Sequence, residues 1–137
     1  WQIGVKDPST GQPMMVLSIR DQAVVTSGGY ERYFQQDGRT YWHIMDPATG
    51  RPAESGLRSV TIVGDDGLVC DGLSTALFVM GLDRGVQFWQ TWRDHDDVRF
   101  ECIFITDDGS VYLTQGLTDR FALTQDHADT PVQVIQR

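Results

Sequence analysis

The sequence predicts an α+β fold in which helices pack on a mostly antiparallel sheet. Three observations support this fold class. Short apolar runs with strand-like composition come before and after one region with helical spacing. The 14 glycines fall mostly in short, turn-like clusters. Hydrophobic content of 40% and charged content of 22% are ordinary for a globular domain, and the chain is long enough to bury one core. Strands, then helices, then strands favour antiparallel pairing over βαβ units.

The first 29 residues read as two strands. Trp1–Val5 is a short strand, and Asp7–Gly11 is the turn that ends it. Met14–Thr26 is rich in aliphatic residues and is predicted to be one long strand, which Ser27–Gly29 terminates. The sequence starts on a strand-like run without a methionine, so we expect it to be a piece of a longer protein.

A hairpin and a rigid loop follow. Glu31–Phe34 and Arg39–Ile44 are rich in aromatic and β-branched residues and flank Asp37-Gly38, which indicates a β-hairpin. Asp46–Pro52 is expected to be a loop, because two prolines and a glycine in seven residues cannot sustain a helix or a central strand. Arg58–Val63 is a compact strand.

Two helices come next. Asp71–Leu82 has apolar residues at helical spacing on one face, with Asp71 as a candidate N-cap and Gly81 as the residue that ends the helix. The residues that share this face are Leu73, Leu77 and Met80. Asp83–Arg93 is predicted to be a second helix.

The last third returns to strands. Val98–Thr106 alternates, with Val98, Phe100, Cys102 and Phe104 on one face, and Ser110–Gln115 pairs back after an Asp-Asp-Gly turn. The pattern weakens after Leu117. Residues Thr118–Arg137 are expected to form an extended tail with one edge strand at Val132–Ile135.

The net charge, the cysteines and the hydropathy argue against several classes of protein. A formal charge of −8 repels a phosphate backbone, so we expect no nucleic-acid partner, and it also repels an anionic cofactor unless a cation offsets the field. Cys70 and Cys102 provide no disulfide framework and are expected to be buried free thiols. No apolar stretch is long enough to cross a bilayer.

Two polar clusters follow strand ends. The small residues Ser27, Gly28 and Gly29 could let a ligand approach the backbone, or could simply form a turn. His43 precedes the rigid loop and could act as a general acid or base, whereas Asp46 more often caps such a turn. Two further histidines, His95 and His127, are expected at the surface.

The third cluster lies on the first predicted helix. Asp71 and Thr75 are four residues apart and therefore project from one side of the helix. The pair could offer a carboxylate and a hydroxyl to a hard cation, beside N–H groups at the helix start for an anion. Alternatively, Asp71 is an N-cap and Thr75 bonds back within the helix.

These clusters occur together, in this order, in one known family. The chain resembles the ApbE-type FAD:protein FMN transferases from Trp1 to about Leu117. Five segments carry the resemblance: Trp1–Pro8, Ala23–Gly28, Tyr41–Pro52, Ser59–Val63 and Asp71–Gly81.

The resemblance implies an activity and a set of site residues. Enzymes of this type bind FAD and magnesium, transfer FMN to a threonine or serine hydroxyl of a target protein and release AMP; some hydrolyse FAD instead. By analogy, Mg²⁺ is held by Asp71, Thr75 and the Ser74 carbonyl, and His43 lies near the pyrophosphate. The flavin nucleotide site is lined by Ser27, Gly28, Thr49 and Gly50. The fold implied is the T-fold-like architecture of this family.

The resemblance also implies partners and a location. Residues 1–117 correspond to the C-terminal portion of a flavin transferase domain and 118–137 to a tail. The N-terminal half, with a glycine-rich segment and flavin-gripping aromatic residues, is missing, so this chain alone is expected to be inactive. The implied acceptor is a flavoprotein domain of a membrane redox complex. The implied location is periplasmic or extracytoplasmic, with an N-terminal lipid anchor. The alternatives are an FAD pyrophosphatase and a non-catalytic flavin-binding module.

Overall fold

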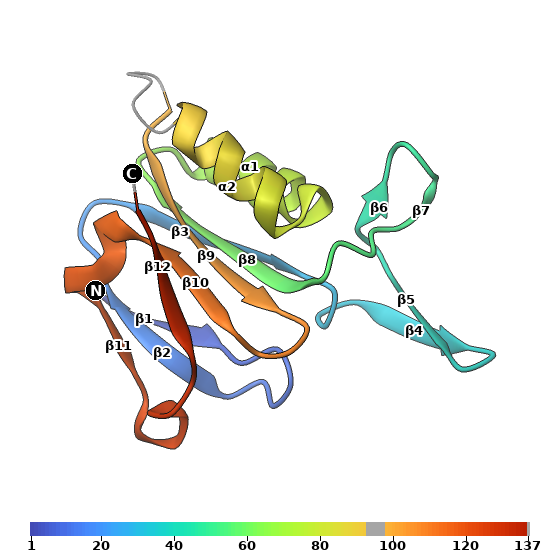
Figure 1. The fold of residues 1–137 in the computed structure, drawn as a ribbon, viewed down its shortest axis with the longest axis horizontal. Coiled ribbons are helices and arrows are strands. Elements are labelled where there is room, and N and C mark those ends of the chain that lie inside the picture. Colours follow the sequence, from blue (N-terminus) through green and yellow to red (C-terminus); the bar gives the residue numbers. More distant parts are fainter. Residues whose placement is uncertain (93–97, 137) are drawn as a thin grey trace.

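A computed structural model describes residues 1–92 and 98–136, in which a five-stranded sheet lies between two helices and a three-stranded sheet (Figure 1). The large sheet has the order β12-β10-β9-β8-β3 and the small one β1-β2-β11. The strands are β1 Gln2–Lys6, β2 Pro13–Ser18, β3 Ala23–Gly28, β4 Tyr33–Gln36, β5 Arg39–Trp42, β6 Met45–Asp46, β7 Arg51–Pro52, β8 Leu57–Gly64, β9 Phe100–Thr106, β10 Val111–Thr114, β11 Phe121–Leu123 and β12 Val132–Ile135. The helices are α1 Gly67–Met80 and α2 Leu82–Trp92, with short 3₁₀ turns at Gln115–Arg120 and Gln125–His127. All the pairings within these two sheets are antiparallel except that of β10 with β12, so the predicted α+β class is confirmed.

The middle strands of the large sheet are buried on both faces. Along β9, the side chains of Phe100, Cys102 and Phe104 enter the core under the helices, and the alternate residues Ile103 and Ile105 enter the core on the other side. This follows from the period-two alternation of a strand. The predicted face of Phe100, Cys102 and Phe104 is confirmed.

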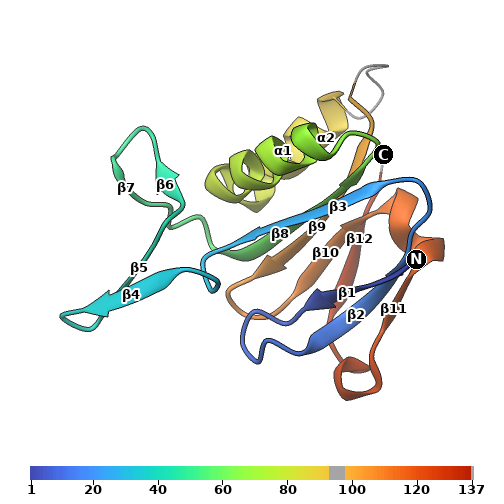
Figure 2. The ribbon, with the colours of Figure 1, turned by 180° about the vertical axis from the view of Figure 1, so that it is seen from behind.

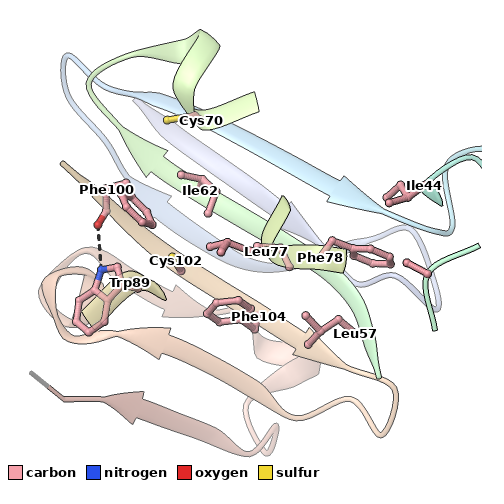
Figure 3. Close-up of a cluster of buried hydrophobic side chains, with 12 residues drawn as sticks. Ile44, Leu57, Ile62, Cys70, Leu77, Phe78, Trp89, Phe100, Cys102 and Phe104 are labelled. Atoms are coloured by element: carbon pink, nitrogen blue, oxygen red, sulfur yellow. Dashed lines mark hydrogen bonds between the residues drawn. The ribbon is translucent and has the colours of Figure 1, made fainter. Parts of the chain in front are cut away.

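The core between the helices and the sheet is shown in Figure 3. Leu77 and Phe78 from α1 and Trp89 from α2 are each no more than 1% exposed. The indole Nε1 of Trp89 donates a hydrogen bond to the Phe100 carbonyl, at 3.0 Å. These contacts hold both helices against the large sheet. The core on the other face of that sheet, which includes Ile103 and Ile105, holds the small sheet against it.

The predicted single strand over Met14–Thr26 is wrong. The chain leaves β2 after Ser18 and enters β3 at Ala23, with Asp21 in the left-handed region at a φ of 54°. β2 belongs to the small sheet and β3 to the large one. The polar residues Arg20, Asp21 and Gln22 lie where the chain passes from one sheet to the other. The aliphatic residues on either side predict strands but do not show that the two strands belong to different sheets.

The first helix begins earlier than predicted. Its N-cap is Asp66, whose carboxylate accepts hydrogen bonds from the backbone N–H groups of Leu68 and Val69. Asp71 is therefore an interior residue, and its predicted capping role is wrong. Gly81 ends the helix as predicted, with a φ of 80°. The second helix is present as predicted but begins one residue earlier, at Leu82, and Arg93 and His95 lie outside the described residues.

The two cysteines are free and buried, as predicted. Burial raises the pKa of both thiols, and the carboxylates of Asp66 and Glu101 add to the effect at Cys70 and Cys102 respectively. Both thiols are therefore poor nucleophiles at neutral pH.

The C-terminal residues are more structured than an extended tail. The predicted edge strand at Val132–Ile135 is present as β12, and β11 adds to β2 in the small sheet. His127 is not a surface residue: its side chain is 18% exposed and its ring contacts Asp7 and Thr124, at 3.3 and 3.0 Å. Across residues 1–92 and 98–136, no helix combines the length and apolar character required to span a membrane.

Residues Tyr33–Pro52 form an arm that stands away from the three layers (Figures 1 and 2). Its first part is the predicted hairpin, β4 with β5, and its second is the small β6–β7 pair around the predicted loop. Asp37 and Gly38 both have positive φ, at 51° and 74°, as a two-residue hairpin turn that follows the strand twist requires. Every residue of β4 is exposed.

Candidate functional site

Three hydroxyl groups meet where the end of β3 passes under α1. Ser27 Oγ lies 2.7 Å from Ser74 Oγ and 3.0 Å from Thr75 Oγ1. The Ser74 hydroxyl also donates to the Asp71 carbonyl oxygen, at 2.9 Å. We call Ser27, Ser74 and Thr75 the hydroxyl cluster. It joins residues 47 and 48 positions apart in the sequence.

The packing of α1 explains why these groups meet. Ser74 is fully buried on the face of α1 that faces the sheet, beside Leu77 and Phe78. β3 pairs with β8 along its whole length, and this pairing places Ser27 beneath the helix. Asp71 lies one turn before Thr75 and is exposed, so its carboxylate is available to solvent next to the cluster.

The donor atoms at this place fit magnesium. Asp71 offers a carboxylate and Thr75 a hydroxyl, and Mg²⁺ in proteins is commonly held by one or two carboxylates together with waters and substrate phosphates. Within the described residues, no group of three or more His, Cys, Asp and Glu side chains could hold a metal ion. A site here therefore depends on few protein ligands.

The Ser74 carbonyl is a less accessible ligand than the family resemblance implies. Ser74 lies within α1, where the helical pattern directs its carbonyl to the amide of Phe78. Its assignment as a metal ligand stays a prediction. What the structure adds is a role for its hydroxyl, which the sequence did not indicate.

The start of α1 does not offer the predicted anion site beside Asp71. The helix N-terminus is at Asp66 and Gly67, and the Asp66 carboxylate already accepts from two of the free amides, at 2.8 and 3.1 Å. A phosphate would have to displace a negative charge there. The Asp65-Asp66-Gly67 run is the signal that could have located this helix start.

His43 lies at the base of the arm and is exposed. Its neighbours Trp42 and Ile44 turn inward: the Trp42 indole donates to the Ala53 carbonyl at 3.1 Å, and Ile44 is 4% exposed in the core. The His43 side chain between these two inward residues is left exposed to solvent. Nδ1 of His43 lies 3.3 Å from the Arg32 carbonyl.

Thr49 and Gly50 occupy the turn between β6 and β7, within the arm (Figure 1). The carboxylate of Asp46 accepts from the Thr49 hydroxyl and the Ala48 amide, and Gly50 has a φ of 64°. This confirms Asp46 as the residue that caps the turn. Within residues 1–92 and 98–136, the hydrogen bonds of Thr49 and Gly50 stay inside this turn and do not reach the hydroxyl cluster. Their role in nucleotide binding stays a prediction.

Gly28 has a packing role next to Ser27. A Cβ at this position would lie 2.5 Å from the ring of Tyr30 and 3.0 Å from the Arg58 carbonyl. Only glycine fits there, whether or not a nucleotide binds.

A pocket of about 370 Å³ opens where the arm joins the body. Of the small residues that were predicted to let a ligand approach, Gly29 lines it, whereas Ser27 and Gly28 do not. The pocket as a whole was not predicted, because its walls come from segments far apart in the chain. The lining residues are Pro8, Ser9, Gly29, Tyr30, Tyr33, Gln35, Thr40, Trp42, Leu57, Arg58, Phe78 and Asp107.

Comparison with known proteins agrees with this architecture. The FAD:protein FMN transferase of Treponema pallidum is 41% identical over 122 residues, which are 88% of this chain and 32% of that protein. That of Rhodobacter capsulatus is 34% identical over 98% of this chain and 25% of its own length. The crystal structure of the ApbE protein from Thermotoga maritima superposes with a TM-score of 0.71 at 39% identity, over 85% of this chain and 36% of that one.

The chain thus spans about a third of the length of the curated relatives that it matches. The family match itself extends over residues 1–100, which include β3, the arm and both helices. On this match and these relatives, the chain belongs to the ApbE family.

Proposed function

We propose that this chain is the cation-bearing part of a magnesium-dependent flavin transferase. The reaction is transfer of FMN from FAD to a threonine or serine hydroxyl of a target protein, with release of AMP. The observation that carries the proposal is the exposed carboxylate of Asp71 one turn before Thr75 of the hydroxyl cluster, in a family whose curated members are named FAD:protein FMN transferase.

The chemistry of the reaction requires this kind of site. The acceptor oxygen forms a bond to the phosphorus of the FMN moiety, the bond to the bridging oxygen breaks, and AMP leaves. Phosphoryl transfer depends mainly on positioning and on neutralising charge. Bound Mg²⁺ would act as a Lewis acid on the phosphate oxygens. Asp71 and Thr75 are the residues of this chain that would hold it, and with a net charge of −8 the chain needs a cation to receive a pyrophosphate.

His43 is suited to accept the proton of the attacking hydroxyl. The Arg32 carbonyl can only accept a hydrogen bond, so Nδ1 of His43 carries the hydrogen in that contact. Nε2 of the neutral ring is then left as the base. The arm would present this nitrogen to the acceptor hydroxyl.

The proposal includes parts beyond this chain. The remaining length of the enzyme would grip the flavin, in line with the partial coverage of the relatives. The acceptor would be a flavoprotein domain of a membrane redox complex. The enzyme would act outside the cytoplasm, tethered by an N-terminal lipid. Fractionation of cells that express the intact protein tests this location, because recovery in the cytosol would contradict it.

The activity is tested with the intact protein, FAD, Mg²⁺ and a candidate acceptor domain. We expect covalent flavin fluorescence on the acceptor after denaturing electrophoresis, and no labelling without Mg²⁺ or with Asp71→Ala. Free FMN and AMP without labelled acceptor would instead identify a pyrophosphatase. Bound FAD with no product would identify a non-catalytic module.

A control variant separates the site from the helix. Asp66→Ala removes the N-cap of α1 but no proposed ligand, so it should retain labelling at a temperature where the protein is folded. Equal loss in both variants would mean that Asp71 acts through the helix and not on the cation.

A further inference from the structure

The three hydroxyls of the hydroxyl cluster can satisfy their contacts in one order only. The Asp71 carbonyl accepts and cannot donate, so the single hydrogen of Ser74 is spent on it. Ser74 Oγ must then accept from Ser27, at 2.7 Å. Ser27 has now used its own hydrogen, so the contact of 3.0 Å with Thr75 must be donated by Thr75.

This order determines what Thr75 presents to solvent. Its hydrogen points inward to Ser27, so the lone pairs of Oγ1 are the part left on the exposed side of α1, the side that carries Asp71. A cation ligand needs this orientation, because an outward O–H would place a hydrogen where the cation binds. Ser74 is fully buried, so the inner end of this series of hydrogen bonds is shielded from water.

We propose that Ser27 is a positioning residue: through the order Thr75 to Ser27 to Ser74 to the Asp71 carbonyl, it holds Thr75 Oγ1 as an acceptor facing the cation. The inference rests on the proposed magnesium site. It gives Ser27 a role different from the predicted contact with the flavin nucleotide, and it gives the Ser74 side chain a role separate from the predicted ligation by its carbonyl. Such outer residues orient ligands and typically change metal affinity about 10- to 100-fold when they are removed.

The adjacent residue provides a matched control. Thr26 lies next to Ser27 near the end of β3, and its hydroxyl pairs with that of Thr61, at 2.8 Å, across the same strand pair. Side chains alternate along a strand, so Thr26 points to the face opposite that of Ser27. Deleting the Ser27 hydroxyl removes its two contacts with α1, whereas deleting the Thr26 hydroxyl removes one contact within the sheet.

The test is Mn²⁺ binding to the intact protein, measured from the signal of free Mn²⁺ in electron paramagnetic resonance, with Mg²⁺ as competitor. We expect Ser27→Ala to weaken Mn²⁺ binding about tenfold and Thr26→Val to leave it unchanged. Ser74→Ala should also weaken it, because Ser27 can then donate to Thr75 and reverse the order. The double variant with Ser27→Ala and Ser74→Ala should bind Mn²⁺ no more weakly than the single variant of lower affinity, because both changes act through Thr75.

The outcomes separate this inference from the proposed function. If wild type binds no Mn²⁺, both the magnesium site and the role of Ser27 are wrong. If wild type binds and Ser27→Ala binds equally, the positioning role is wrong while the function stands. Equal weakening by Thr26→Val, or additive loss in the double variant, would show a general effect on β3 and also overturn the role. Circular dichroism checks folding, and Ser74→Ala decides alone should Ser27→Ala fail to fold.

Discussion

The hydroxyl cluster and the arm hold their candidate residues in opposite ways. Ser27, Ser74 and Thr75 lie on elements that pack against the core. Two short hydrogen bonds join their side chains, and a third joins the Ser74 hydroxyl to the Asp71 carbonyl. The arm carries His43 and the Thr49–Gly50 turn, and it contacts the core at its base, through Trp42 and Ile44.

This difference suggests that the hydroxyl cluster and the arm have different roles, one in binding the cation and the other in meeting the acceptor protein. A cation site needs ligands held in advance, because a small shift weakens every bond to the ion. An element that meets a second protein can be less fixed, because the partner supplies contacts on binding. We therefore expect substitutions where α1 packs on the sheet to affect stability, and substitutions in the arm to affect mainly function.

The largest difference is expected between two phenylalanines. Phe78 of α1 is 1% exposed, whereas Phe34 of β4 is 59% exposed and stacks on Tyr41 with ring centroids 5.1 Å apart. Phe78→Ala should lower the free energy of unfolding by about 3–5 kcal/mol, because it leaves a cavity beneath the helix. Phe34→Ala should lower it by about 0.5 kcal/mol. Urea denaturation followed by circular dichroism measures both, and similar losses would mean that the arm is part of the core.

The next difference is between two aspartates of the α1 region. Asp66→Ala should lower the free energy of unfolding by about 1–2 kcal/mol, because two backbone amides lose their acceptor. Asp71→Ala should change it by less than about 0.5 kcal/mol, because its side chain is exposed on the helix surface. The same denaturation experiment compares them. A larger loss at Asp71 would mean that the carboxylate stabilises the helix itself.

A third prediction concerns acid. Burial alone would raise the pKa of Asp7, but hydrogen bonds from the Ser9 amide, His127 and Thr10 together lower it. A lowered pKa means that the native state binds fewer protons, so Asp7 stabilises the fold above its unfolded value of about 3.9 and loses this contribution as the pH falls through its native value.

Asp7→Asn should therefore be less stable than wild type at pH 7, by about 1 kcal/mol or less, and the two proteins should converge at about pH 2. Thermal denaturation across this range measures the difference. A constant difference at all pH values would show that the loss comes from packing and not from the charge.

Short-range patterns predicted much of this fold. The alternation of Phe100, Cys102 and Phe104, the Asp37-Gly38 turn and the helix end at Gly81 each depend on residues close together in the chain. Each of these signals states a local preference of the backbone or a period of burial. All three agree with the structure.

Features that depend on the arrangement of layers could not be predicted. The break between β2 and β3 exists because the two strands join different sheets. The hydroxyl cluster exists because α1 crosses β3, which brings Ser27 to residues 47 and 48 positions away. Ser27, Ser74 and Thr75 were each predicted as site residues, but only the packing shows that their side chains form one hydrogen-bonded cluster.

The smallest effect on stability is expected at His43. His43→Gln keeps a polar side chain at an exposed position whose recorded hydrogen bond, to the Arg32 carbonyl, is long at 3.3 Å, so the free energy of unfolding should change by less than about 0.5 kcal/mol. Labelling of the acceptor by the intact protein should nevertheless fall about 100-fold, because glutamine cannot take the proton of the attacking hydroxyl. Mn²⁺ affinity should stay unchanged, in contrast to the loss expected for Ser27→Ala. Weaker Mn²⁺ binding in His43→Gln would place His43 at the cation and join the two regions into one site, whereas unchanged labelling would remove it from the reaction.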